Sequence, residues 1–269
     1  MINTIIKDTT SGIRQEEAEV KSLFGLEIIR RPAKDNAIVN DAMESTEDVK
    51  VFRHRRLKIG RTLFFGFEPL KNVKNVGLIL YPGTLVDVKA YAPIAKFLAE
   101  NGYHAVLATP PFYLTVADID LADDVINFGW KDEVKTWAIT GHSQGGALAC
   151  TYAKRNQGTK LKGVVLLAAY AGDSSSSLEG DLSETDYKVV SIYGSVDGIA
   201  LYEDVVVEGA KKLPPSTKFV KIEGGNHTQF SYVAKLQEGR GKTDGEATIS
   251  LDEQIWDICD TLLEHLSLL

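Results

Sequence analysis

The chain has 269 residues, of which 44% are hydrophobic and 25% are charged. These proportions are typical of a folded globular protein and exclude collagen-like, disordered and disulfide-scaffold classes. Lys and Arg together number 30 and Asp and Glu 37, and the resulting net charge of −7 disfavours broad electrostatic binding to nucleic acid or to anionic lipid.

The N-terminal residues and the cysteines favour a cytoplasmic protein with no membrane span. Cys150 and Cys259 are too few for a disulfide framework, which fits a reducing compartment. The first ten residues lack the basic head and apolar run of a signal peptide. No uninterrupted apolar stretch approaches the roughly 18 residues of a membrane-spanning helix.

The chain divides into an N-terminal extension of uncertain structure, residues 1–47, and a larger domain, residues 48–269. Within the extension, residues 11–24 have the spacing of a short amphipathic helix. The domain begins with two runs rich in β-branched and aromatic residues, 49–54 and 57–67, which predict two strands joined by a tight basic turn.

From Val76 onward, short apolar runs alternate with longer amphipathic ones. This alternation predicts an α/β fold, with a mostly parallel central sheet and helices on both faces. The expected strands are residues 76–81, 103–108, 136–140, 163–169, 189–193 and 218–222. The expected helices are residues 87–100, 118–128, 143–156, 201–212 and 250–265. In such sheets ligands bind beyond the carboxyl ends of the strands, so reactive residues should directly follow a strand.

The strongest functional signal is the segment 141–146, GHSQGG. It matches G-x-S-x-G and lies between a predicted strand and a predicted helix, the setting in which this pattern forms a nucleophile elbow. The sharp turn strains the serine backbone and presents its hydroxyl above the sheet, while the helix N-terminus behind it favours developing negative charge. Ser143 is therefore the candidate nucleophile.

A serine hydroxyl needs a general base, and His227 is the histidine that the pattern places in a loop after a strand. The base in turn needs an acid that fixes its tautomer. Asp197 follows the strand 189–193, and the chain order serine, aspartate, histidine is that of α/β folds with a G-x-S-x-G elbow. Asp173 also follows a strand and remains the alternative acid, although its serine-rich surroundings favour a solvated loop.

Two backbone N–H groups are expected to bind a developing oxyanion. One belongs to Gln144, the residue after the nucleophile. The other is expected in the loop after the strand 76–81, where Thr84 and Leu85 are both candidates.

These residues resemble the α/β-hydrolase superfamily, and more narrowly its small dienelactone-hydrolase-like, serine-esterase branch. The segments that carry the resemblance are YPGTLVDVKAYAPIAKFLAENGYHAV, GHSQGGALA, VVSIYGSVDG and IEGGNHTQF, within about residues 76–230. The resemblance implies an α/β-hydrolase fold with Ser143 as nucleophile, Asp197 as acid and His227 as base. Two features depart from it: dienelactone hydrolases have a cysteine nucleophile, and the HGGG oxyanion motif of some lipases is replaced here by YPGT.

The substrate pocket is expected to be formed without a large cap domain, because residues 171–186 are too few and too polar for a helical cap. An apolar loop at a strand end and two further aromatic residues are the expected walls; the alternative is that these side chains pack in the core. The expected wall residues are Phe112, Tyr113, Leu114, Tyr170 and Phe230. Residues 237–248, rich in glycine and charge, are expected to form a mobile loop beside His227.

No cofactor and no metal are expected, because the sequence has no H-E-x-x-H and no paired C-x-x-C motif. The sequence therefore predicts a serine hydrolase that cleaves a small-molecule carboxylic ester of short to medium acyl chain through an acyl-enzyme. The alternatives are acyl transfer, thioester or amide hydrolysis at the same residues, and a non-catalytic ligand-binding protein. The oligomeric state is not predicted.

Overall fold

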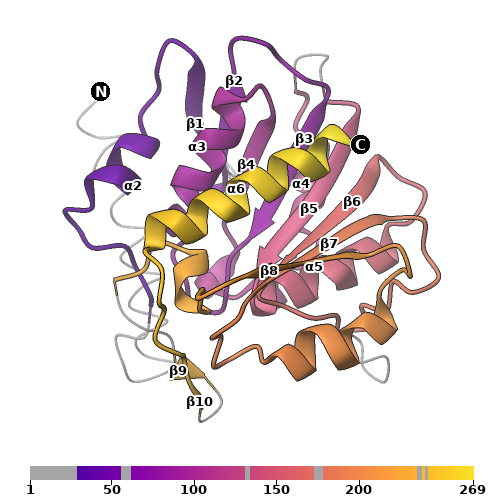
Figure 1. The fold of residues 1–269 in the computed structure, drawn as a ribbon. Helices are drawn as coiled ribbons and strands as arrows, with labels where there is room; N and C mark the ends of the chain where they lie inside the picture. Colours follow the sequence, from indigo (N-terminus) through magenta and orange to yellow (C-terminus); the bar gives the residue numbers. More distant parts are fainter. Residues whose placement is uncertain (1–28, 56–61, 131–133, 173–177, 235–237, 240–241) are drawn as a thin grey trace.

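An eight-stranded sheet forms the centre of the molecule, in the strand order β1-β2-β4-β3-β5-β6-β7-β8 (Figure 1). The computed structural model describes residues 29–55, 62–130, 134–172, 178–234, 238–239 and 242–269. The strands are β1 (Val49–Arg55), β2 (Thr62–Pro69), β3 (Val76–Tyr81), β4 (His104–Ala108), β5 (Thr136–His142), β6 (Leu161–Leu167), β7 (Lys188–Gly194) and β8 (Lys218–Ile222). β2 pairs antiparallel with β1 and with β4, and the remaining neighbours are parallel. The predicted α/β fold, with a mostly parallel sheet, is confirmed.

Strand β3 is buried along its whole length because both of its faces are covered. Leu78 and Leu80 belong to one buried cluster, which includes residues of α3 (Ala92–Glu100) and α6 (Leu251–Ser267). Ile79 and Tyr81 belong to a second cluster, which includes residues of α4 (Leu121–Ile126) and α5 (Gln144–Arg155). The continuous apolar run at 76–81 thus reflects helices on both faces of the sheet.

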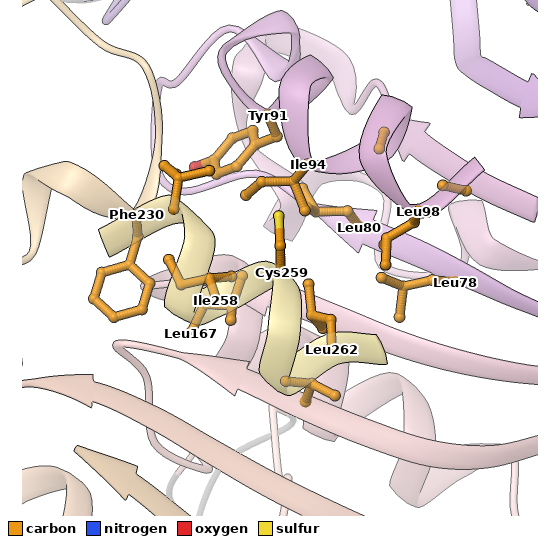
Figure 2. Close-up of a cluster of buried hydrophobic side chains, with 14 of the residues drawn as sticks. Leu78, Leu80, Tyr91, Ile94, Leu98, Leu167, Phe230, Ile258, Cys259 and Leu262 are labelled. Carbon is orange, nitrogen blue, oxygen red and sulfur yellow. The ribbon is translucent and has the colours of Figure 1, made fainter. Parts of the chain in front are cut away.

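Helix α6 crosses the sheet on the same face as α3, and the short helix α2 (Ala37–Ala42) contacts α3 (Figure 1). The α6 side chains Ile258 and Leu262 form a buried group with Leu78 and Leu80, as Figure 2 shows. Burying each of these side chains stabilises the fold by about 1.5–3 kcal/mol. Ser250 caps the helix by accepting a hydrogen bond from the Glu253 N–H.

Three expected helices differ from the structure in form. Residues 87–100 begin with a 3-10 turn, η1 (Val88–Tyr91), before α3, and 118–128 contain only the short α4. Residues 201–212 form a π-helix, η4 (Glu203–Glu208), followed by a 3-10 turn, η5 (Gly209–Lys212). Three consecutive valines in η4 weaken the preference for a regular α-helix, because β-branched side chains crowd the preceding turn.

Several expectations fall outside the described residues: the helix at 11–24, the start of the strand at 57–67, and Asp173. Part of the segment 237–248 is described, and it includes the strand pair β9 (Glu238–Gly239) and β10 (Lys242–Thr243). Asp244, which follows β10, is buried and accepts five hydrogen bonds. The segment thus contacts His227, as expected, and at Asp244 it is packed into the protein rather than exposed. In the part of the chain described, no helix is long and apolar enough to cross a membrane.

Candidate active site

Ser143 occupies the sharp turn between β5 and α5, with backbone angles φ 55° and ψ −127°. A positive φ is unfavourable for a residue with a side chain, so this backbone is strained. Ser143 is partly exposed, whereas the residues of β5 before it are buried apart from the first. The turn thus presents the serine at the carboxyl end of the strand, as the elbow pattern predicts.

The glycines of the elbow allow it to pass against neighbouring backbone. A Cβ at Gly145 would lie 2.3 Å from the Pro82 carbonyl oxygen and 2.5 Å from that of Tyr81. A Cβ at Gly141 would lie 2.3 Å from the carbonyl carbon of Gly145. The first turn of α5 therefore lies directly against the end of β3, which brings Ser143 close to the loop that follows β3.

His227 and Asp197 form a buried pair. The ring Nδ1 of His227 lies 2.8 Å from Oδ2 of Asp197, and both residues are less than a tenth exposed. The other carboxylate oxygen, Oδ1, accepts hydrogen bonds from the N–H groups of Ile199 and Ala200 at 2.8 and 2.7 Å. These two bonds fix the carboxylate, and the carboxylate fixes the orientation of the imidazole.

The second ring nitrogen of His227, Nε2, takes no part in the hydrogen bond to Asp197. This Nε2 is buried and makes no hydrogen bond to any described residue, Ser143 included. The imidazole lies beside the elbow, because its ring centre is 4.6 Å from that of His142, the residue before Ser143. The structure therefore brings His227 and Asp197 together and holds the imidazole next to the turn that carries Ser143.

Tyr91 and His142 connect the elbow to the loop after β3, a role that was not predicted for either residue. The Tyr91 hydroxyl accepts a hydrogen bond from the Gly83 N–H at 3.0 Å and lies 2.8 Å from Nδ1 of His142. Burial lowers the pKa of His142 well below the ordinary histidine value, so its ring is neutral, and Nδ1 shares one hydrogen bond with the tyrosine hydroxyl. A buried tyrosine hydroxyl needs such partners, but no sequence pattern identifies which residues they are.

The two candidates for the second oxyanion donor differ in the structure. The Leu85 N–H donates to the Tyr113 carbonyl at 2.9 Å, so Leu85 is unavailable and the expectation that it could serve is wrong. Thr84 is joined to the elbow by a hydrogen bond from its hydroxyl to Oε1 of Gln144 at 3.0 Å, and its carbonyl accepts from Arg30. Within the described ranges, the N–H groups of Thr84 and Gln144 have no acceptor.

Most of the expected pocket residues lie at least partly at the surface. The partly exposed ones are Phe112, Tyr113, Leu114 and Tyr170. Phe230 is fully buried in the core and stacks on His142 with ring centres 5.7 Å apart. The expectation that Phe230 lines the pocket is therefore wrong, because its side chain has no exposed surface and packs against the ring of His142. Among the residues described, no group of three or more His, Cys, Asp or Glu side chains could hold a metal ion.

Comparison with known proteins identifies the family. The model of the alpha/beta hydrolase family matches residues 77–256, about two thirds of the chain. A crystal structure described as a predicted CIB-like hydrolase from Thermoplasma acidophilum aligns with a TM-score of 0.54 and 16% identity, over 80% of this chain and 98% of that one, and shows the shared fold. No curated protein matches the chain. The chain belongs to the alpha/beta hydrolase family.

Proposed function

We propose that this hydrolase cleaves carboxylic esters through an acyl-enzyme formed on Ser143. Family membership supports hydrolysis as the reaction class. The observation that carries the finer proposal is the buried Asp197–His227 pair, whose Nε2 has no described partner and whose ring lies beside the strained serine turn. A histidine oriented by a carboxylate and next to a serine is the arrangement that makes a hydroxyl nucleophilic.

In the first half of the reaction, Oγ of Ser143 attacks the ester carbonyl carbon while its proton passes to Nε2 of His227. The tetrahedral intermediate then expels the alcohol, which takes the same proton from His227 as the C–O bond breaks. In the second half, a water molecule gives its proton to His227 and attacks the acyl carbon. The acid is released as the bond to Ser143 breaks and the proton returns to Oγ.

The N–H groups of Gln144 and Thr84 are the proposed donors to the oxyanion. Both are without an acceptor in the described structure, and the hydrogen bond between the Thr84 and Gln144 side chains joins the two segments that carry them. Gln144 is also the first residue of α5, where the helix dipole favours negative charge. Removing one such donor typically lowers turnover by about 10²–10³.

The proposed substrate has a short to medium acyl chain. The connection between β6 and β7 spans only residues 168–187, which is too short for a large cap over the site. With Phe230 in the core, the partly exposed residues at 112–114 and Tyr170 are the proposed contacts for the acyl chain. A short wall of this kind suits a small acyl group better than a long one.

Hydrolysis of p-nitrophenyl acetate, butyrate, octanoate and palmitate tests this proposal. We expect wild-type turnover to peak at butyrate or octanoate, and Ser143→Ala to reduce every rate to background. Ser191→Ala, a buried serine in β7, is the matched control and should retain activity. A peak at palmitate would contradict the acyl-chain assignment, and undiminished activity in Ser143→Ala would contradict the mechanism.

A further inference from the structure

A second buried carboxylate, Asp244, lies against the loops that carry Asp197 and His227. Its Oδ1 accepts hydrogen bonds from the N–H groups of Gly198 and His227, both at 3.1 Å, and from the Gly245 N–H at 2.8 Å. Its Oδ2 accepts from both the N–H and the hydroxyl of Thr228 at 2.7 Å. One side chain thus binds the residue after Asp197, His227 itself and the residue after His227.

The backbone of this segment is packed equally closely against the Asp197 loop. A Cβ at Gly245 would lie 1.8 Å from the Val196 carbonyl oxygen, and one at Gly198 would lie 2.5 Å from the Thr243 carbonyl oxygen. The Asn226 side chain adds a hydrogen bond to the Gly245 carbonyl at 2.8 Å. Glycine is required at 198 and 245 because the two backbones touch there.

The chemistry of Asp244 indicates a role more specific than packing. A buried acid is costly unless hydrogen bonds satisfy it, and here five donors do so with no cation among its described partners. The donors come from both loops, so the carboxylate fixes their separation. That separation determines where Nε2 of His227 lies relative to Ser143.

We propose that Asp244 is a positioning residue that holds the Asp197 and His227 loops in the geometry needed for proton transfer. The inference rests on the proposed serine mechanism and assigns Asp244 no contact with the reacting atoms. It predicts that losing the carboxylate impairs the chemical step rather than substrate binding, because small misplacements of a catalytic group lower rates steeply.

Asp244→Asn is the most direct test because it preserves the shape of the side chain. In either orientation of the amide, its NH₂ group faces N–H donors that the carboxylate now satisfies. We expect kcat for p-nitrophenyl butyrate to fall about 10- to 100-fold with KM unchanged. Glu246→Gln, an exposed acid two residues further on, is the matched control and should behave as wild type.

A second readout keeps this test independent of ester hydrolysis. The downfield proton resonance of the His227 Nδ1–H reports the bond to Asp197, and we expect it to weaken or disappear in Asp244→Asn. If this variant does not fold, Thr228→Val removes one of the five donors and should give a smaller loss of kcat and a shifted resonance.

The inference is overturned if Asp244→Asn or Thr228→Val folds and keeps the wild-type kcat and an unchanged His227 resonance. This holds even if the melting temperature of that variant is lower. Failure of the proposed function looks different: wild-type protein would neither hydrolyse esters nor react with a fluorophosphonate. In that case the resonance still decides whether Asp244 holds the pair.

Discussion

The hydroxyl of Tyr91 lies 2.8 Å from Nδ1 of His142 and accepts a hydrogen bond from the Gly83 N–H, so a residue of η1 holds the loop after β3 against the elbow. The same His142 ring lies 4.6 Å from that of His227. One buried, neutral imidazole thus lies between the proposed base and the support of the proposed oxyanion loop. The loop after β3, η1, the end of β5 and the loop after β8 are thus connected beside the elbow by these contacts.

Tyr91→Phe should lower kcat by about 10-fold, because the Gly83 N–H loses its acceptor and the loop that carries Thr84 is released. The unsatisfied donor should also lower the free energy of unfolding by about 1–3 kcal/mol. Tyr187→Phe is the control, since its buried hydroxyl bonds the backbone at Ala153 and Asn156, away from the site. Equal effects of both variants on kcat would contradict a specific role for Tyr91. Steady-state kinetics and urea unfolding measure the two effects.

Asp197→Asn should lower kcat by about 10⁴-fold while the protein stays folded. The N–H groups of Ile199 and Ala200 hold one side-chain oxygen in place, so the amide NH₂ would point at Nδ1 of His227. That nitrogen would then accept rather than donate, and the proton would sit on Nε2, where it blocks base catalysis. The exposed Asp186→Asn serves as control. Retention of most activity by Asp197→Asn would argue against Asp197 as the acid.

Gly145→Ala should lower both stability and activity. Its Cβ would lie 2.3 Å from the Pro82 oxygen, and overpacking of this kind costs about 1–3 kcal/mol. Gly158→Ala is a useful comparison, because that position has open space but a φ of 78°. Gly158→Ala should lower the free energy of unfolding by about 1 kcal/mol, because alanine is strained at this φ, and it should leave kcat unchanged. Wild-type kcat in Gly145→Ala would show that the elbow tolerates displacement. Thermal unfolding and ester hydrolysis report the two quantities.

Stability should fall as the pH is lowered from about 6.5 to 4, because burial lowers the pKa of His265 to about 4. Over this range the unfolded chain binds a proton at His265 that the folded chain does not. The free energy of unfolding should therefore be lower by about 3 kcal/mol at pH 4 than at pH 6.5. Burial lowers the pKa of His104 and His142 in the same direction. In His265→Gln the slope of the unfolding free energy against pH should be smaller, by the equivalent of close to one bound proton. An identical slope in the variant, measured by urea unfolding at several pH values, would contradict this.

The periodicity of the sequence was sufficient to predict the sheet. The strands from β3 to β8 lie within two residues of their expected bounds. For β3 to β7 the reason is that a strand covered on both faces is a continuous apolar run flanked by turn residues. Ser143 directly follows β5 and His227 lies in the loop after β8, and these places at the carboxyl ends of strands are what made both residues candidates.

The predictions for Leu85 and Phe230 failed, and the burial of Asp244 was missed, for a common reason. The surroundings of these residues are set by contacts between segments that are distant in the sequence. The Leu85 N–H is taken by Tyr113, 28 residues later, and no local pattern reveals such a bond. Phe230 could equally have lined a pocket or packed in the core, and its contact with His142 decides between them. Asp244 lies in a segment rich in glycine and charge, which is typical of a solvated loop, so its burial was not predictable.

Covalent labelling by a fluorophosphonate, followed by mass spectrometry of the tryptic peptides, tests most directly whether Ser143 is the nucleophile. We expect one label per chain, on Ser143, with labelling abolished in Ser143→Ala and slowed at least a hundredfold in His227→Ala. A folded wild-type protein that remains unlabelled, or that carries the label on another residue, would rule out Ser143 as the nucleophile.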